Sequence, residues 1–196
     1  MQLDLFAQKK MRVLVACEYS GRVRDAFTAK GCQAMSCDLL PTDAPGWHYQ
    51  GDVRDVINDG WDLMVAHPPC TYLSVSGMHW TTRGLRDPQL TEDALAFVQL
   101  LMDAPIPRIA IENPVSVISS RIRKPDQIIQ PWMFGHGETK ATCLWLKGLP
   151  LLTPTDVVSG REQRIWKLPP SPDRWKIRSA TYAGIARAMA QQWGQQ

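Results

Sequence analysis

Apolar runs alternate with amphipathic stretches along the chain, and this alternation predicts strands and helices in turn. The apolar runs have the length of buried strands and lie over residues 11–17, 32–38, 61–67, 107–111 and 141–147. Helical spacing of the apolar positions marks residues 22–30, 91–102 and 181–193. Thr91 has the side chain of a helix cap, and a short helical piece is expected after Asp52. Elements in this order predict an α/β fold with a mostly parallel, doubly wound sheet and helices on both faces.

The length of 196 residues fits a single domain, because one core of this size buries about 70% of the surface that the unfolded chain exposes. No internal repeat or linker divides the sequence, so we expect one domain over residues 1–196. Residues 148–178 contain five prolines and predict a loop-rich flap on this domain rather than a second domain.

The composition points to a soluble protein with reduced cysteines. No apolar stretch approaches the about 20 residues that span a bilayer, and Met1–Lys10 lack the apolar core of a secretory signal. We therefore expect a cytoplasmic protein without a membrane partner. The cysteine count of five is odd and no CxxC pair occurs, which favours free thiols over a disulfide framework or a metal site.

The net charge of +3 is too small to identify a nucleic-acid binder, but its distribution is uneven. Basic residues crowd the stretch 161–178, where Trp166 and Trp175 lie among them. Cations beside aromatic rings suit phosphates and unstacked bases, which makes Arg164 and Arg174 candidate substrate-binding residues. A solvated loop with its tryptophans in the core explains the pattern equally well.

Polar residues follow the first two predicted strands. The Ser20–Gly21 turn precedes a helix, where backbone N–H groups can hold an anionic group of a ligand. Asp38 ends the second strand, where an acid can accept hydrogen bonds from ribose hydroxyls. Asp52 has two interpretations, as an acceptor for an adenine amino group or as the cap of the helical piece that follows. The G-x-G-x-x-G pattern is absent, which disfavours nicotinamide and flavin cofactors.

His67-Pro68-Pro69-Cys70 follows the next apolar run. Two consecutive prolines stiffen this loop and remove two backbone donors, so we expect the Cys70 thiol to point off the sheet. A buried structural cysteine beside a proline turn is the alternative. His67 can tune the thiol or serve as a hydrogen-bonded histidine at a strand end.

Glu112-Asn113-Pro114 comes directly after the apolar run over 107–111. Burying an unpaired carboxylate costs several kcal/mol, so Glu112 is expected to be partly neutral or paired. A partly neutral carboxyl group can donate a proton, whereas a salt bridge to an arginine would make Glu112 structural. A thiol that attacks a ring carbon and a carboxyl group that protonates a ring nitrogen together perform cytosine C5 alkylation.

At these residues the chain resembles the C5-cytosine DNA methyltransferase family, in the small phage type without a separate target-recognition domain. Pro69–Cys70 resembles the family's nucleophile loop, Glu112–Asn113 its Glu-Asn pair and Ser179–Ala190 its last motif. The resemblance implies the Rossmann-like methyltransferase fold, S-adenosyl-L-methionine as cofactor and DNA as partner, with a single-stranded or flipped-out cytosine. It implies the catalytic residues Cys70, Glu112 and Asn113, and for a phage protein the host cytoplasm.

The resemblance also implies the binding residues. For the cofactor these are Cys17, Glu18, Ser20, Gly21, Asp38, Asp52 and Pro68. For the substrate they are Pro69, Lys140 and Thr142, beside Arg164 and Arg174 from the basic stretch. The loop Cys17–Gly21 has fewer glycines than the family's loop, and the family's Gln-x-Arg-x-Arg strand falls on residues 138–142, which contain no arginine.

Other functions remain open at this stage. Pro68–Pro69 also resembles the loop of amino-methyltransferases, which methylate an exocyclic base amine, although His67 and Cys70 are the wrong residue types for it. A nonenzymatic DNA-binding or anti-restriction homologue is another interpretation, and the intact Cys70 and Glu112 argue against it. RNA or a free nucleotide as acceptor is a further alternative, given the missing recognition domain.

Overall fold

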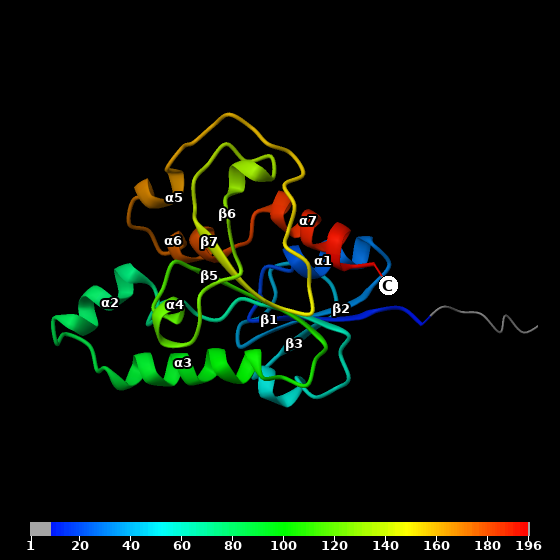
Figure 1. Cartoon of the computed structure of the whole chain (residues 1–196), viewed down its shortest axis with the longest axis horizontal. Helices are drawn as coiled ribbons and strands as arrows, with labels where there is room; N and C mark the ends of the chain where they lie inside the picture. The colour runs from blue at the N-terminus through cyan, green and yellow to red at the C-terminus, as the bar shows by residue number, and fades with distance from the viewer. Residues whose placement is uncertain (1–8, 196) are drawn as a thin grey trace, which may run out of the picture.

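One sheet of seven strands forms the centre of the computed structural model, which describes residues 9–195 (Figure 1). The strands are β1 (Arg12–Ala16), β2 (Gln33–Asp38), β3 (His48–Gln50), β4 (Leu63–Ala66), β5 (Arg108–Pro114), β6 (Gln127–Ile129) and β7 (Thr142–Lys147). Their order across the sheet is β3-β2-β1-β4-β5-β7-β6. The first five strands in this order are parallel, and β7 runs antiparallel to both of its neighbours. The mostly parallel α/β sheet predicted from the sequence is confirmed.

Helices cover both faces of this sheet. They are α1 (Arg22–Ala29), α2 (Val75–Thr82), α3 (Gln89–Met102), α4 (Ile118–Arg121), α5 (Arg164–Lys167), α6 (Arg174–Ser179) and α7 (Ala183–Trp193), with 3-10 turns η1 (Val53–Asp55) and η2 (Pro131–Met133). Helices α1 and α7 pack side by side on one face, whereas α3 crosses the other (Figure 1). Helix α2 projects from the body next to α3 and buries none of its side chains.

The core consists of two apolar layers, one on each face of the sheet. Val13 and Val15 of β1 pack with Phe27 and Trp193 under α1 and α7. Leu14 and Ala16 of the same strand belong to the layer under α3. Successive side chains of a strand point to opposite faces, so a strand covered on both sides must be apolar at every position. This is why the central strands read as continuous apolar runs.

Several local expectations differ from the structure. Helix α3 begins at Gln89, and Thr91 lies inside it with its hydroxyl donating to the carbonyl of Tyr72, so the predicted cap is wrong. The stretch 148–178, predicted to be loop-rich, also contains α5 and most of α6, which the sequence did not indicate. Strands β3 and β6 have three residues each and were missed, because such short runs carry no periodicity.

Strand β5 runs farther than the sequence indicated. Its parallel pairing with β4 ends at the register pair of Ala66 and Ile111. Its antiparallel pairing with β7 continues, and Glu112 lies opposite Leu144 and Asn113 opposite Cys143. The Glu-Asn-Pro segment is therefore part of a strand rather than a loop after it. Its side chains are held by a paired backbone.

Arg24 is a fully buried cation in α1 that fixes a neighbouring loop. Its guanidinium donates to the carbonyl oxygens of Ala44 and Pro45, to the Ser36 hydroxyl and to Asp25. A Cβ atom at Gly46 would lie 2.6 Å from Arg24 Cζ, so the loop can approach this closely only with glycine there.

No helix within residues 9–195 is long and apolar enough to cross a membrane. The segment Met1–Lys10, in which the sequence shows no secretory signal, lies mostly outside the described residues. Only Lys9 and Lys10 of this segment are described. Each of the five cysteines, all of which lie inside that range, is a free thiol.

Candidate active site

The chain turns sharply where β1 ends. Cys17 has a φ of +58°, and it is the one non-glycine residue with a left-handed φ in the described part of the chain. Gly21 follows with a φ of +72°. A non-glycine residue in this region is strained, and such strain gathers at functional sites. The loop Cys17–Gly21 is therefore a candidate binding loop, as the sequence predicted.

Glu18 caps helix α1 from within this loop. Its buried carboxylate accepts hydrogen bonds from the backbone N–H groups of Val23 (2.7 Å) and Arg24 (3.2 Å) and from the Ser20 hydroxyl (3.1 Å). The expectation that first-turn N–H groups after Ser20–Gly21 hold an anionic ligand is wrong for these two donors. A carboxylate of the protein already binds them and interacts favourably with the helix dipole.

Acidic side chains surround the Cys17 thiol. Burial raises the pKa of Cys17, and the charges of Asp38 and Asp52 raise it further, so these two carboxylates form a negative patch near the neutral thiol. Burial also raises the pKa of Asp38, whose Oδ1 accepts a hydrogen bond from the backbone of Leu40. Such a patch suits a ligand that carries a positive charge and hydroxyl or amino donors.

Asp52 has the second of its two predicted roles. Its Oδ1 accepts from the Arg54 backbone N–H at 2.9 Å, which caps η1, and its Oδ2 pairs with the Arg54 guanidinium at 2.7 Å. These contacts lower the pKa of Asp52. A carboxylate has about four acceptor sites, so these bonds leave room for an amino donor of a ligand.

The proline loop after β4 carries the candidate nucleophile. Pro68 is buried, whereas Pro69 and Cys70 are exposed, so the thiol lies outside the core as predicted. Protein packed around the sulfur raises the pKa of Cys70, and the Glu112 carboxylate raises it further, whereas Lys140 lowers it. The thiol is therefore protonated at neutral pH and must lose its proton before it can attack.

Backbone contacts join the Cys70 loop to the end of β5. Ser74 and Ser116 form an isolated antiparallel bridge, and the N–H of Val117 donates to the carbonyl of Leu73 at 3.0 Å. The register of β4 and β5 places the end of one strand beside the end of the other. The two catalytic motifs predicted from distant stretches of sequence are brought together.

Glu112 forms an ion pair with His67, which follows β4. Glu112 Oε2 and His67 Nδ1 are 3.1 Å apart. Burial alone would raise the pKa of Glu112, but the hydrogen bond and charge of His67 outweigh it and the pKa is lowered. Burial alone would lower the pKa of His67, and Glu112 likewise reverses that shift. Our expectation of a partly neutral Glu112 is therefore wrong, and its partner is a histidine rather than an arginine.

Two buried polar atoms at this point have no hydrogen-bond partner within residues 9–195. The Asn113 side-chain N–H donates to the carbonyl of Pro68 at 2.8 Å, which ties the proline loop to β5, but Asn113 Oδ1 accepts no hydrogen bond. His67 Nε2 is also buried and unpaired. Buried polar atoms in native proteins are nearly always paired, so such atoms mark a place where a ligand or water completes the site.

Lys140 and Thr142, the two residues predicted to bind the substrate base, lie just before β7 and at its first position. Lys140 Nζ donates to the carbonyl of Arg178 at 2.8 Å, and its charge lowers the pKa of both Cys70 and Glu112. Thr142 is buried in β7, and its hydroxyl donates to the Lys140 carbonyl. Lys140 thus lies within electrostatic reach of the site, whereas the Thr142 hydroxyl is used by the backbone.

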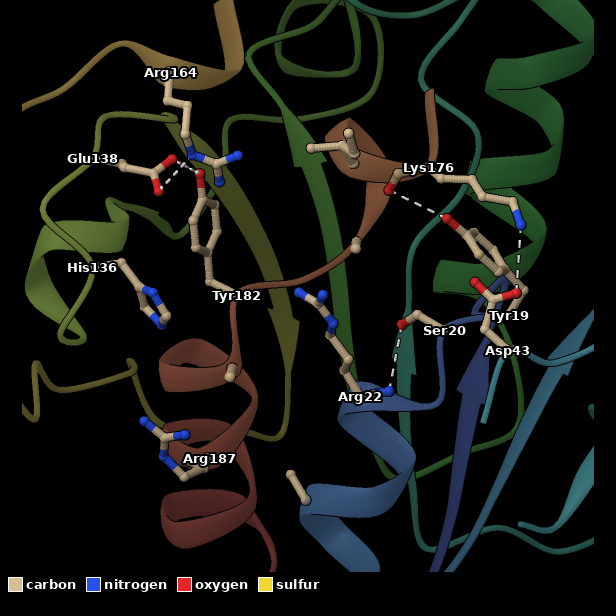
Figure 2. A pocket seen from close by; sticks show the side chains of 14 residues that line it. Tyr19, Ser20, Arg22, Asp43, His136, Glu138, Arg164, Lys176, Tyr182 and Arg187 are labelled. Atoms are coloured by element: carbon tan, nitrogen blue, oxygen red, sulfur yellow. Dashed lines mark hydrogen bonds and ion pairs between the residues drawn. The ribbon is translucent and has the colours of Figure 1, made fainter. Parts of the chain in front are cut away.

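A cavity of about 820 Å³ adjoins this region (Figure 2). Ser20 and Arg164 line it, and Arg164 Nε pairs with Glu138 at 3.0 Å. Arg174 does not line it, and its Nε atom is buried without a partner. The sequence analysis missed several lining residues, among them Arg22, His136, Tyr182 and Arg187. The only signal for any of these four was the resemblance of Ser179–Ala190 to the family's last motif, which contains Tyr182 and Arg187.

Comparison with known proteins supports the fold and little beyond it. No protein-family model matches the chain, and no curated protein does. Among solved structures it is similar to one entitled "Structure Analysis of Entamoeba histolytica methyltransferase EhMeth", with 14% identity and a TM-score of 0.50. The similarity covers 81% of this chain and 59% of that chain, so this chain spans less than two thirds of its neighbour. At this identity the likeness shows a shared α/β fold.

Proposed function

We propose that this protein transfers a methyl group from S-adenosyl-L-methionine to C5 of cytosine in DNA, through a covalent bond between Cys70 and C6. The observation that carries the proposal is the meeting of the Cys70 loop with the His67–Glu112 pair at neighbouring strand ends, where Asn113 Oδ1 and His67 Nε2 have no partner. A pyrimidine base would bring hydrogen-bonding groups to such atoms. The methyltransferase-like fold is consistent with this chemistry.

The residues around Cys17 fit the cofactor in part. Asp38 and Asp52 can accept hydrogen bonds from ribose hydroxyls and an adenine amino group, and their charges favour a sulfonium cation. Cys17, with its left-handed backbone, follows β1, and Pro68 lies in the loop after β4. Bound S-adenosyl-L-methionine supplies an electrophilic methyl group. Glu18 holds the loop rather than the ligand, because its carboxylate is directed at α1.

The proposed reaction begins at Cys70. Its exposed thiol loses a proton to water, and the sulfur forms a bond to C6 of the base. The electron pair of the C5–C6 double bond moves toward N3, which takes a proton from Glu112. Because the pKa of Glu112 is lowered and that of His67 is raised, the proton is stored on His67 and reaches N3 through Glu112. C5 then has the electron density to accept the methyl group.

The reaction ends with the reverse steps at the protein. A base removes the C5 proton, the bond between C6 and the Cys70 sulfur breaks, and the N3 proton returns through Glu112 to His67. Asn113 keeps the proline loop against β5 throughout, because its side chain is bonded to the Pro68 carbonyl. A stacked cytosine cannot meet the thiol, so duplex DNA requires base flipping at a cost of a few kcal/mol.

Nucleoside analysis of the product tests the proposal. The protein is incubated with labelled cofactor and separate pools of duplex DNA, single-stranded DNA, RNA and dCMP, and the nucleosides are separated by mass spectrometry. We expect label in 5-methylcytosine from DNA. Label in N4-methylcytosine or N6-methyladenine would show that the methyl acceptor is an exocyclic amine and would contradict transfer to C5. Absence of label from every pool would contradict an enzymatic role.

A 5-fluorocytosine oligonucleotide tests the covalent step. When S-adenosyl-L-methionine is present, methyl transfer leaves fluorine on the methylated C5, and fluorine cannot be removed by a base as a proton is, so the bond between Cys70 and C6 should persist and be found on the Cys70 peptide. Cys32→Ser serves as the matched control, because Cys32 is a thiol far from the site that bonds the Gly194 carbonyl. The adduct should form in that variant and disappear in Cys70→Ser.

A further inference from the structure

The cavity of about 820 Å³ is lined by none of Cys70, His67 and Glu112, and the proposed chemistry does not explain it. It is open on one side and is lined by the first turns of α1 and α7, by the loop that holds His136 and Glu138, and by α6 (Figure 2). Arg22 lies at its α1 side and Arg187 at its α7 side. The cavity is large enough for a nucleotide, since ligand pockets range from about 300 to 1,000 Å³.

The cavity carries a surplus of positive charge. Four cationic side chains and two carboxylates line it. Both carboxylates are already paired, Glu138 with Arg164 at 3.0 Å and Asp43 with Lys176 at 3.5 Å. Arg22 and Arg187 form no ion pair within residues 9–195, and the Arg22 guanidinium donates to the carbonyl of Thr181. Two charges therefore remain uncompensated.

The positive charges around the cavity affect the pKa of His136. Its Nε2 accepts a hydrogen bond from the backbone N–H of Gly184 at 3.0 Å, so its ring serves as a neutral acceptor rather than a further cation. Burial lowers the pKa of His136, and the charge of Arg187 lowers it further, with smaller effects of Arg22 and Arg164 in the same direction. Glu138 opposes these shifts without reversing them. An anion would relieve this field.

The cavity is connected to the Cys70 site by two side chains. Tyr182 lines the cavity, and its hydroxyl donates to Glu138 at 2.6 Å. Lys140 Nζ lies 5.9 Å from the centre of the Tyr182 ring, and its charge acts on Cys70 and Glu112. An acceptor whose base reaches Cys70 would therefore have its neighbouring phosphates near this cavity.

We propose that Arg22 and Arg187 bind phosphate groups of the acceptor nucleotide or of its neighbours in the same strand, which rests on the proposed function for the identity of the acceptor. A guanidinium binds a phosphate through two parallel N–H donors. Two uncompensated charges match two phosphodiesters or one terminal phosphate monoester. The cavity would thus fix the strand while the base reacts.

Binding without any methyl donor tests this inference. A fluorescent single-stranded oligonucleotide with one cytosine is titrated with the wild-type protein and with Arg22→Gln/Arg187→Gln at several salt concentrations. We expect affinity to fall about 10- to 100-fold. The slope of log K against log salt should decrease by about 1.4, because each neutralised phosphate of a single strand contributes about 0.7 to it. Arg22→Lys/Arg187→Lys keeps both charges and should retain most of the slope.

Matched controls separate the cavity from general charge. Lys30→Gln/Lys124→Gln also removes two exposed cations, and neither lines the cavity. This control should lose less than about 3-fold in affinity. Competition by dCMP but not by deoxycytidine would identify a monoester as sufficient, whereas competition only by longer strands would identify the diesters. Thermal unfolding confirms that each variant is folded.

Several outcomes would overturn the inference. Unchanged affinity in Arg22→Gln/Arg187→Gln would do so, as would an equal loss of affinity in Lys30→Gln/Lys124→Gln. The inference would also fail if the wild-type protein bound neither the strand nor dCMP. A loss of affinity for S-adenosyl-L-methionine, measured by calorimetry, with strand binding intact would assign the two arginines to the cofactor carboxylate instead. Phosphate-dependent binding without any methylated product would leave the cavity assignment standing and contradict the proposed reaction.

Discussion

The loop after β1 and the ends of β4 and β5 differ in whether their buried polar groups have hydrogen-bond partners. In the first, Glu18 accepts three hydrogen bonds from its own loop and helix. In the second, His67 Nε2 and Asn113 Oδ1 are buried without a partner. The first arrangement is complete by itself and holds the chain in place. The second is completed only by a further molecule, so chemistry is expected there.

The difference separates residues that a resemblance alone would group together. Glu18 follows β1 and Glu112 lies in the last part of β5, and both are shielded from solvent, yet one caps a helix and the other forms an ion pair beside a thiol. Substituting the first should cost stability, and substituting the second should cost turnover. The predictions below test this contrast, from the largest expected effect to the smallest.

Cys70→Ser should have the largest effect. Loss of the nucleophile should reduce methyl transfer below about 10⁻⁴ of the wild-type rate, because a serine hydroxyl is a far weaker nucleophile at neutral pH. Transfer of labelled methyl groups to DNA measures the rate. Affinity for S-adenosyl-L-methionine should stay within about 2-fold, and a variant with undiminished transfer would rule out the covalent route.

Glu112→Gln should slow methyl transfer by about 10²- to 10⁴-fold, the usual contribution of general acid catalysis. The amide can still donate a hydrogen bond to a ring nitrogen but cannot deliver a proton. Single-turnover kinetics isolate the chemical step. Glu92→Gln is the matched control, since Glu92 forms an exposed pair with Arg121 away from the site. Equal rates in the two variants would remove Glu112 from the mechanism.

Glu18→Ala should lower the free energy of unfolding by about 2 to 3 kcal/mol, because two N–H groups of α1 and the Ser20 hydroxyl lose a charged acceptor. Urea unfolding followed by circular dichroism measures the change. Glu162→Ala removes an exposed carboxylate and should change stability by less than about 0.5 kcal/mol. If both variants were equally stable, Glu18 would not be a cap.

The His67–Glu112 pair should produce the smallest effect, a pH-dependent stability of about 1 to 2 kcal/mol relative to His67→Gln. The raised pKa of His67 gives stability that is lost as pH rises through that pKa, above 6.5. The lowered pKa of Glu112 gives stability that is lost as pH falls through that pKa, below 4.5. The gap in melting temperature between the two proteins should therefore be widest between about pH 4.5 and 6.5. A gap independent of pH would contradict the charged pair.

The sequence predicted what depends on local pattern. The apolar run of β1 and the two prolines before Cys70 are visible in the chain itself, and the structure confirms the strand and the exposed thiol. The ion pair of Glu112 was not predictable, because His67 lies 45 positions away and meets it only through the register of β4 and β5. The continuation of β5 depends likewise on the antiparallel partner β7.

The cavity was the least predictable feature. Arg22 and Arg187 lie at opposite ends of the sequence and converge only because α1 and α7 pack side by side. No spacing rule connects two such residues. The basic stretch 161–178, in which the sequence placed the substrate contacts, contributes Arg164 and Lys176 to the cavity, but both of these are already paired with carboxylates.

The buried guanidinium of Arg24 has a consequence for how this protein can vary. Because the guanidinium occupies the space that a side chain at position 46 would need, Arg24 restricts the residues allowed at position 46. A library randomised at both sites and selected for folding should return glycine at 46 whenever arginine remains at 24. Glycine should stay favoured at 46 even beside a smaller residue at 24, because its φ of +151° is a backbone conformation that other residues rarely adopt.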